Sequence, residues 1–233
     1  DLRMSRGLGD VYKRQVRYIM KTEFIKFQSE DKIDLLLHGM VYMKELQYYV
    51  DLEKKEQNDI VGDALENAVF SKAYETPSGI PCNLILKNGF CKSFVFCIYE
   101  ADLDDDRSVI MHESDKIKKF GDYALWIKNM DQFIKRIQLA ALKRDYHITN
   151  DKVIYYDDTE EVPIEVMQSV SDKGTYAFGK RKKFKYQNEY RFVINTKLDE
   201  IPNEDYLILD IGDISDITQK IKTQDLINGK RLL

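Results

Sequence analysis

The chain has 233 residues, with 36 Lys and Arg against 40 Asp and Glu, and a formal net charge of −4. Hydrophobic residues make up 43% and aromatic residues 12%, and only 4 Pro occur, which excludes collagen-like, low-complexity and linker-rich classes. The sequence has no apolar run near the roughly 18 residues that a membrane helix needs, and no signal-peptide pattern. We therefore expect a cytoplasmic protein with no membrane contact.

The chain opens with the stretch DLRMSRGLGDVYKRQ, which has no periodicity that continues into the residues after it. This stretch resembles sequencing-adapter read-through at the ends of translated environmental sequences. We expect residues 1–19 to be a non-native extension and the natural start to lie at or near Met20. The remainder, 20–233, has the length of one globular domain with a substantial core.

Strand and helix signals follow one another in an irregular order. Phe24–Phe27 has a strand pattern, and Ser29 is placed to cap a helix that ends at Gly39. Met40–Met43 predicts a strand and Glu45–Gln57 a helix. Further strands are predicted at Phe94–Tyr99, Tyr123–Ile127, Lys152–Tyr156, Gln187–Ile194 and Tyr206–Asp210, and further helices at Met130–Arg144 and Pro163–Val170.

The helix predicted at Met130–Arg144 has the clearest apolar face, because Phe133, Ile137 and the two alanines after it recur at helical spacing. The pattern at Ile214–Ile221 fits either a helix or a strand. Strands and helices are mixed without strict alternation, which predicts the α+β class. We expect a single domain with a central mixed or antiparallel sheet flanked by helices.

Common catalytic and metal motifs are absent from the sequence. Cys82, Cys91 and Cys97 match no zinc spacing and no nearby histidine completes one, so we predict reduced thiols and no metal. No Gly-x-Ser-x-Gly, phosphate-binding loop or dinucleotide glycine motif occurs. Asp63 and Glu66 are three apart, a spacing that fits either a solvated first turn of a helix or a pair of acids on one helical face.

A basic run at Lys180–Lys185 leads directly into an aromatic strand that begins with Gln187. Alternate residues of a strand share a face, so Gln187, Glu189 and Arg191 would lie together. A carboxylate within a strand is unfavourable unless it is paired or exposed, and Arg191 can supply the partner. This polar face of the strand is therefore either a functional site or the solvent-exposed side of an edge strand. The basic run is either a solvated loop or a contact for a phosphate-bearing ligand.

Short motifs occur in a fixed order along Met20–Thr223: Phe-Ile-Lys-Phe, Leu-x-x-Gly-x-Val-Tyr-Met, Gly-Asp-x-x-Glu, Phe-Gly-Asp-Tyr-Ala, Val-Ile-Tyr-Tyr and Gln-x-Glu-Tyr-Arg-Phe. In this series the chain resembles a family of uncharacterised bacterial and prophage proteins. That resemblance covers nearly the whole domain and implies no activity.

The segment Gln187-Asn188-Glu189 is similar to the Gln/Glu-x-Glu motif of ADP-ribosyltransferases. The resemblance implies NAD as the cofactor and a protein or nucleic acid as the acceptor. Glu189 would hold the 2′-hydroxyl of the nicotinamide ribose and favour an oxocarbenium-like state, while Gln187 would orient the acceptor. Lys26, Tyr42 and Arg191 would contact the dinucleotide.

Two other functions remain open. The chain can be a non-enzymatic interaction module of a prophage or defence type, in which Lys180–Lys185 contacts nucleic acid with steeply salt-dependent affinity. It can also be a metal-dependent nuclease in which Glu189 and Arg191 stand in a Glu-x-Lys-like position. Arginine substitutes poorly for that lysine, because it stays charged and cannot act as a base.

Overall fold

A computed structural model describes residues 22–56, 62–63, 68–75, 81–87, 91–111, 113–157, 163–173, 175–197 and 204–232. The expected extension at 1–19 and the carboxylate of Glu66 lie outside these residues.

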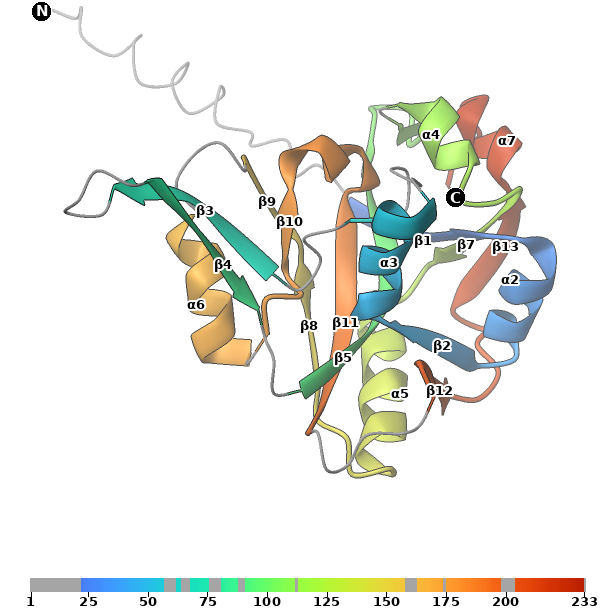
Figure 1. Cartoon of the computed structure of the whole chain (residues 1–233). Coiled ribbons are helices and arrows are strands. Elements are labelled where there is room, and N and C mark those ends of the chain that lie inside the picture. The colour runs from blue at the N-terminus through green and yellow to red at the C-terminus, as the bar shows by residue number, and fades with distance from the viewer. Residues whose placement is uncertain are drawn as a thin grey trace, which may run out of the picture.

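One large sheet forms the centre of the fold (Figure 1). Its strands are β1 (Thr22–Gln28), β2 (Met40–Glu45), β5 (Cys91–Leu103), β6 (Val109–Ile110), β7 (Tyr123–Ile127), β8 (Ile148–Lys152), β11 (Glu189–Lys197), β12 (Tyr206–Asp210) and β13 (Thr218–Lys222). The main path runs β12-β2-β5-β1-β7-β13, and β11 joins β5 to β8. All pairings within this sheet are antiparallel.

Helices and two small sheets surround the large one. The helices are α2 (Glu30–Leu37), α3 (Leu46–Glu56), α4 (Ser114–Lys118), α5 (Met130–Leu142), α6 (Ile164–Lys173), α7 (Thr223–Ile227) and the 3-10 helix η1 (Lys182–Gln187). An antiparallel hairpin joins β3 (Ala68–Glu75) to β4 (Pro81–Lys87), and a parallel pair joins β9 (Ile154–Tyr156) to β10 (Gly179–Arg181).

The large sheet separates two apolar layers. Phe96 of β5 packs with Phe133 and Ile137 of α5 on one face, whereas Val95 packs with Leu46 of α3 on the other. Neighbouring residues of a strand point to opposite faces, so α5 and α3 lie on opposite sides of β5. This arrangement confirms the predicted α+β class with helices flanking a sheet.

Most predicted elements occur close to their predicted positions. The strand at Tyr206–Asp210 has the predicted bounds, and the predicted helix at Met130–Arg144 ends two residues earlier, at Leu142. The ambiguous segment Ile214–Ile221 contains the start of strand β13 rather than a helix, and the hairpin of β3 and β4 was not predicted.

The turn from α2 to β2 requires a glycine. Gly39 has a φ of 90°, and a Cβ placed there would lie 2.1 Å from the carbonyl oxygen of Gly212. A side chain would clash with that main chain, so the predicted end of the helix at Gly39 also fixes where β2 starts.

The sheet is split between β1 and β2. Along one edge of β5, β2 pairs at Phe94 and Val95, whereas β1 pairs at the four residues from Tyr99 to Asp102. The three residues 96–98 pair with neither of these strands. The helix α2 connects the two strands, and the stretch of β5 between them that is unpaired along this edge opens the sheet.

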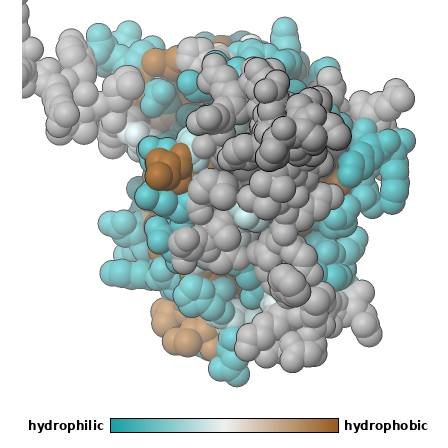
Figure 2. Space-filling view, turned by 60° about the vertical axis from the view of Figure 1, so that its left-hand side comes forward, coloured by the Kyte–Doolittle hydropathy of each residue, from teal (hydrophilic) through white to brown (hydrophobic). Residues whose placement is uncertain are grey.

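The surface carries scattered apolar side chains. In Figure 2 the hydrophobic colour of the described residues occurs as separate patches within hydrophilic surface. The exposed large apolar residues belong to several elements, and they include Leu35, Tyr48, Ile110 and Ile164, with Leu139 and Leu142 together on α5. Within the part of the chain that is described, no helix has both the length and the apolar character needed to cross a membrane.

The contact between α5 and the sheet can be tested with two substitutions on one helix. Ile137 is fully buried and Leu139 is 58% exposed. Ile137→Asp should lower the free energy of unfolding by roughly 3 kcal/mol or more, because it buries an unpaired charge. Leu139→Asp should change it by only about 0.5 kcal/mol. Urea unfolding of both variants measures the difference, and equal effects would contradict the packing of α5.

Candidate functional site

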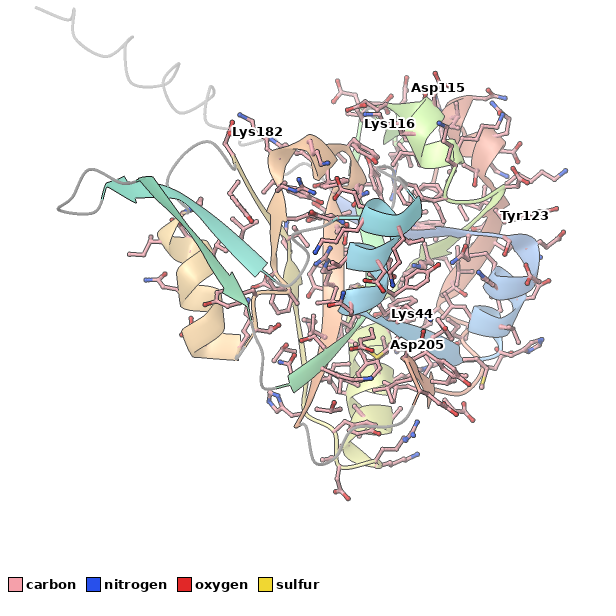
Figure 3. All side chains as sticks on the ribbon, viewed as in Figure 1. Lys44, Asp115, Lys116, Tyr123, Lys182 and Asp205 are labelled. Atoms are coloured by element: carbon pink, nitrogen blue, oxygen red, sulfur yellow. The ribbon has the colours of Figure 1, made fainter. Side chains whose placement is uncertain are left out.

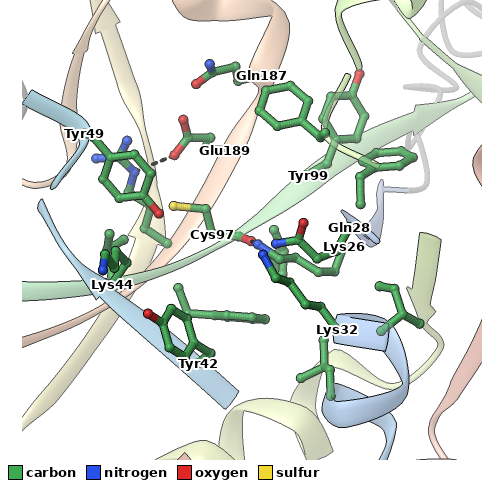
Figure 4. A pocket seen from close by; sticks show the side chains of 18 of the residues that line it. Lys26, Gln28, Lys32, Tyr42, Lys44, Tyr49, Cys97, Tyr99, Gln187 and Glu189 are labelled. Atoms are coloured by element: carbon green, nitrogen blue, oxygen red, sulfur yellow. Dashed lines mark hydrogen bonds and ion pairs between the residues drawn. The ribbon is translucent and has the colours of Figure 1, made fainter. Parts of the chain in front are cut away.

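A pocket of about 780 Å³ opens where β1 and β2 diverge. All five residues that the sequence predicted for the site line it: Lys26 of β1, Tyr42 of β2, Gln187 at the end of η1, and Glu189 and Arg191 of β11. In Figure 4, Gln187 and Glu189 lie on one side of this hollow, with Lys26 and Tyr42 on others. Residues from four elements therefore meet at one place.

The local structure around Gln187 differs from the prediction. We predicted a strand that begins at Gln187, but this residue ends η1 and the strand begins at Glu189. Asn188, between them, has a φ of 35°, in the left-handed region, and its side-chain amide donates to the carbonyl oxygen of Glu100. Gln187 and Glu189 are instead joined by Lys180, whose Nζ donates to the Oε1 atoms of both at 2.6 Å.

Glu189 lies between two buried cations. Its Oε1 accepts from Lys180, and its Oε2 accepts from Nε of Arg191 at 2.6 Å. The exposed fractions of Glu189, Lys180 and Arg191 are 8%, 4% and 1%, so solvent screens these contacts little. The predicted partnership of Arg191 with Glu189 is confirmed.

The cations determine the ionisation of this carboxyl. Burial acts to raise the pKa of Glu189, but Arg191 and Lys180 outweigh burial and hold the pKa well below its usual range. Glu189 therefore stays ionised across the physiological range. It can accept hydrogen bonds and present a negative charge, but it cannot supply a proton.

The charged side chains that line the pocket are mostly positive. Its lining includes the basic residues Lys26, Lys32, Lys44, Lys119, Lys180 and Arg191, and the acidic residues Asp31 and Glu189. Lys44 donates to Asp205 at 2.7 Å at the rim of the sheet, where Figure 3 labels both side chains. Clefts with an excess of one charge attract ligands of the opposite charge, so this lining favours an anion.

Aromatic rings form much of the remaining wall. The lining includes Phe27, Tyr42, Tyr48, Tyr49, Phe96, Tyr99 and Phe120. Tyr42 stacks on Tyr206 with ring centroids 5.2 Å apart, and it remains 48% exposed. Supported aromatic rings of this kind offer faces for a planar ligand group.

The basic run Lys180–Lys185 is partly engaged within the protein, and three of its lysines are exposed. Arg181 donates to the carboxylates of Asp63 and Glu53, both at 2.5 Å, and Lys183 contacts Glu53 at 2.7 Å. Asp63 is buried, so it does not belong to a solvated helical turn. The run therefore fastens β10 and η1 to α3, which carries two tyrosines of the pocket wall.

The thiol of Cys97 also faces the pocket (Figure 4). Burial raises the pKa of Cys97 to about 12, so it remains a neutral thiol and is a poor nucleophile. In the ranges that the structure describes, no cluster of three or more His, Cys, Asp or Glu is arranged to hold a metal ion.

Several residues of the pocket were not among the predicted site residues. The sequence indicates Lys180 only as a member of the basic run, and it does not indicate Lys32 or Lys44 as site residues. Lys44 follows Tyr42 by two residues in β2, so strand alternation places both on one face and was the available signal. The partnership of Lys180 with Glu189 had no comparable signal, because it depends on the turn formed by η1.

Comparisons of the chain with protein-family models, with curated proteins and with solved structures each find no match. The resemblances seen in the sequence therefore remain predictions. Function is therefore inferred from the geometry of the pocket.

The energetic role of Glu189 can be tested by Glu189→Gln. The substitution keeps the shape and leaves Lys180 and Arg191 buried without a counter-charge, so it should lower the free energy of unfolding by about 3 kcal/mol or more. Asp216→Asn is the matched control, because its pair with Arg136 lies at the surface. It should cost no more than about 1 kcal/mol. Denaturant unfolding gives both values, and a fully stable Glu189→Gln would exclude a structural role for the pair.

The same pair predicts a pH dependence. The folded pKa of Glu189 is lowered, so its contribution to stability is present above the unfolded pKa, about 4.3, and is lost as the pH falls below that value. The difference in unfolding free energy between the parent and Glu189→Gln should be constant near neutrality and should shrink in acid. Denaturant titrations at several pH values measure it. A difference that grows on acidification would mean that the pKa is raised instead.

Proposed function

We propose that the protein binds NAD or a closely similar dinucleotide in the pocket between β1 and β2. The observation that carries this proposal is the meeting of cationic and aromatic side chains around an ionised carboxylate. Cations bind phosphate through charge-assisted hydrogen bonds, and aromatic rings stack on nucleobases. The pocket volume of about 780 Å³ is in the range of small-molecule sites.

Glu189 supports the proposal as a hydrogen-bond acceptor. A carboxylate has about four acceptor positions, and the described side-chain contacts of Glu189 use one on each oxygen. The others are available to a hydroxyl of a ribose. Because the carboxylate stays ionised, it would hold that hydroxyl without exchanging a proton.

Binding has more support than transfer of the ADP-ribose group. Glu189 is accompanied by Lys180 and Arg191, so the three groups together carry a positive charge. Such a cluster attracts phosphate, but it stabilises a developing oxocarbenium less than a lone carboxylate would. Transfer is therefore the second step of the proposal, supported by the position of an ionised Glu189 in the pocket.

The nucleic-acid and nuclease alternatives have less support. A binding surface for nucleic acid needs a track of exposed cations. In the run Lys180–Lys185, Lys180 is buried against Glu189 and Arg181 is paired with two acids, which leaves three exposed lysines, one of them in contact with Glu53. Glu189 is paired with Arg191 and Lys180, so its carboxylate is already engaged and is a poor metal ligand for the nuclease alternative.

Calorimetric titration with NAD tests the binding proposal. We expect saturable binding that weakens with salt, and Lys32→Ala should weaken it about tenfold, the value of one charge-assisted contact. Lys135→Ala is the matched control, because Lys135 is exposed on α5 and does not line the pocket. Absent binding, or equal loss in the control, would contradict the proposal.

Release of nicotinamide from NAD tests the transfer step separately. If Glu189 is catalytic, Glu189→Gln should abolish release at a temperature where the variant is still folded by circular dichroism. A folded variant that releases nicotinamide at the parent's rate would exclude the catalytic role. A parent that binds NAD and releases none, with protein and nucleic-acid acceptors supplied, would leave binding as the function.

A further inference from the structure

Lys26 occupies the split in the sheet. Its Nζ donates to the carbonyl oxygen of Cys97 at 2.7 Å and lies 4.8 Å from the ring centroid of Phe96. Both residues belong to the three-residue stretch of β5 that pairs with neither β1 nor β2. The ammonium of Lys26 thus donates the hydrogen bond that the main-chain amide of a paired strand would otherwise donate, at the point where the pocket enters the sheet.

Lys26 differs from other lysines of the pocket in its partner. Lys180 donates to the carboxylate of Glu189, and Lys44 donates to that of Asp205. Among the described contacts of Lys26, the hydrogen-bond acceptor is a neutral main-chain carbonyl. An ammonium without a directly bonded carboxylate loses its proton more readily than a paired one.

The burial and the charged neighbours of Lys26 together lower its pKa. Burial is the largest influence and lowers the pKa of Lys26, and Lys32 acts in the same direction. Cys97 and Glu189 act to raise it, and burial outweighs them. A larger fraction of Lys26 is therefore the neutral amine near neutral pH than of an ordinary lysine, and a neutral amine is nucleophilic.

We propose that Lys26 is a covalent attachment site for an aldehyde that also carries a phosphate or similar anionic group. The lone pair of the amine attacks the aldehyde carbon and a C–N bond forms. The carbonyl oxygen leaves as water with both amine hydrogens, and a proton from solvent gives the protonated imine. The protonated imine carries one N–H, the proton taken from solvent, which can donate to the carbonyl of Cys97.

The anionic group has a place beside this amine. Lys32 is an exposed lysine of the lining, and in Figure 4 its side chain extends toward the same hollow as Lys26. Lys44 and Tyr42 lie on the opposite side in that view. A ligand joined to Lys26 would thus meet a cation for its phosphate and an aromatic wall for a planar ring. This inference shares the pocket with the dinucleotide proposal but does not depend on it.

Pyridoxal phosphate, trapped with borohydride and located by peptide mapping, tests the inference on the unaltered full-length chain. We expect the modification at Lys26 to saturate at concentrations where Lys135, the exposed control on α5, is unmodified. Lys26→Arg, which keeps the charge but cannot form an imine, should lose this saturable modification. Lys32→Ala should raise the half-saturating concentration about tenfold, as expected for one lost charge-assisted contact.

Two results would overturn the inference. One is modification spread over exposed lysines, with Lys26 reacting no faster than Lys135. The other is equal modification by pyridoxal without phosphate, which would remove the anionic requirement. Because trapping is done without NAD, a failure of NAD to bind leaves its outcome unaffected. If NAD in excess does not protect Lys26, the dinucleotide site is contradicted and the aldehyde site stands.

Discussion

The site depends on one buried carboxylate shared by two cations. Moving each charge of Glu189, Lys180 and Arg191 out of water costs several kcal/mol, which the short hydrogen bonds among them must offset. A well-packed apolar cluster of similar volume would serve stability at least as well. The charges instead determine the positions of neighbouring elements. Through Lys180, Glu189 of β11 holds β10 and the end of η1 in place. Lys180 then holds Gln187 at the same pocket.

The pocket exists because β5 is longer than the strands beside it. β5 has 13 residues, and β1 and β2 each pair with only part of one edge. The residues between these pairings leave a main-chain carbonyl at Cys97 that needs a donor, and Lys26 supplies it. The same interruption that costs strand pairing thus brings an amine, a thiol and the Glu189 cluster into one cavity.

Local periodicity predicted most of the fold, and contacts distant in sequence determined the rest. The apolar stripe of α5 and the strand at Tyr206–Asp210 are local patterns, so the sequence shows them directly. The left-handed turn at Asn188 is held by a carbonyl 88 residues away, and Arg181 finds Asp63 at a separation of 118. No short stretch of sequence contains both partners of either contact. The predicted strand therefore begins too early, and the burial of Asp63 against Arg181 was not predicted.

The charge pattern limits the kind of anion that the pocket can select. The basic run looks in sequence like a surface for a polyanion, yet Arg181 and Lys183 are paired with acids of distant segments and Lys180 is buried. The remaining excess of cations lines a concave pocket of about 780 Å³. A polyanion gains affinity from many exposed phosphate contacts along its length, whereas a small ligand needs a few that converge. The cations that converge on the pocket therefore favour a small phosphate-bearing molecule, whereas the exposed lysines of the run, Lys182, Lys183 and Lys185, do not line it.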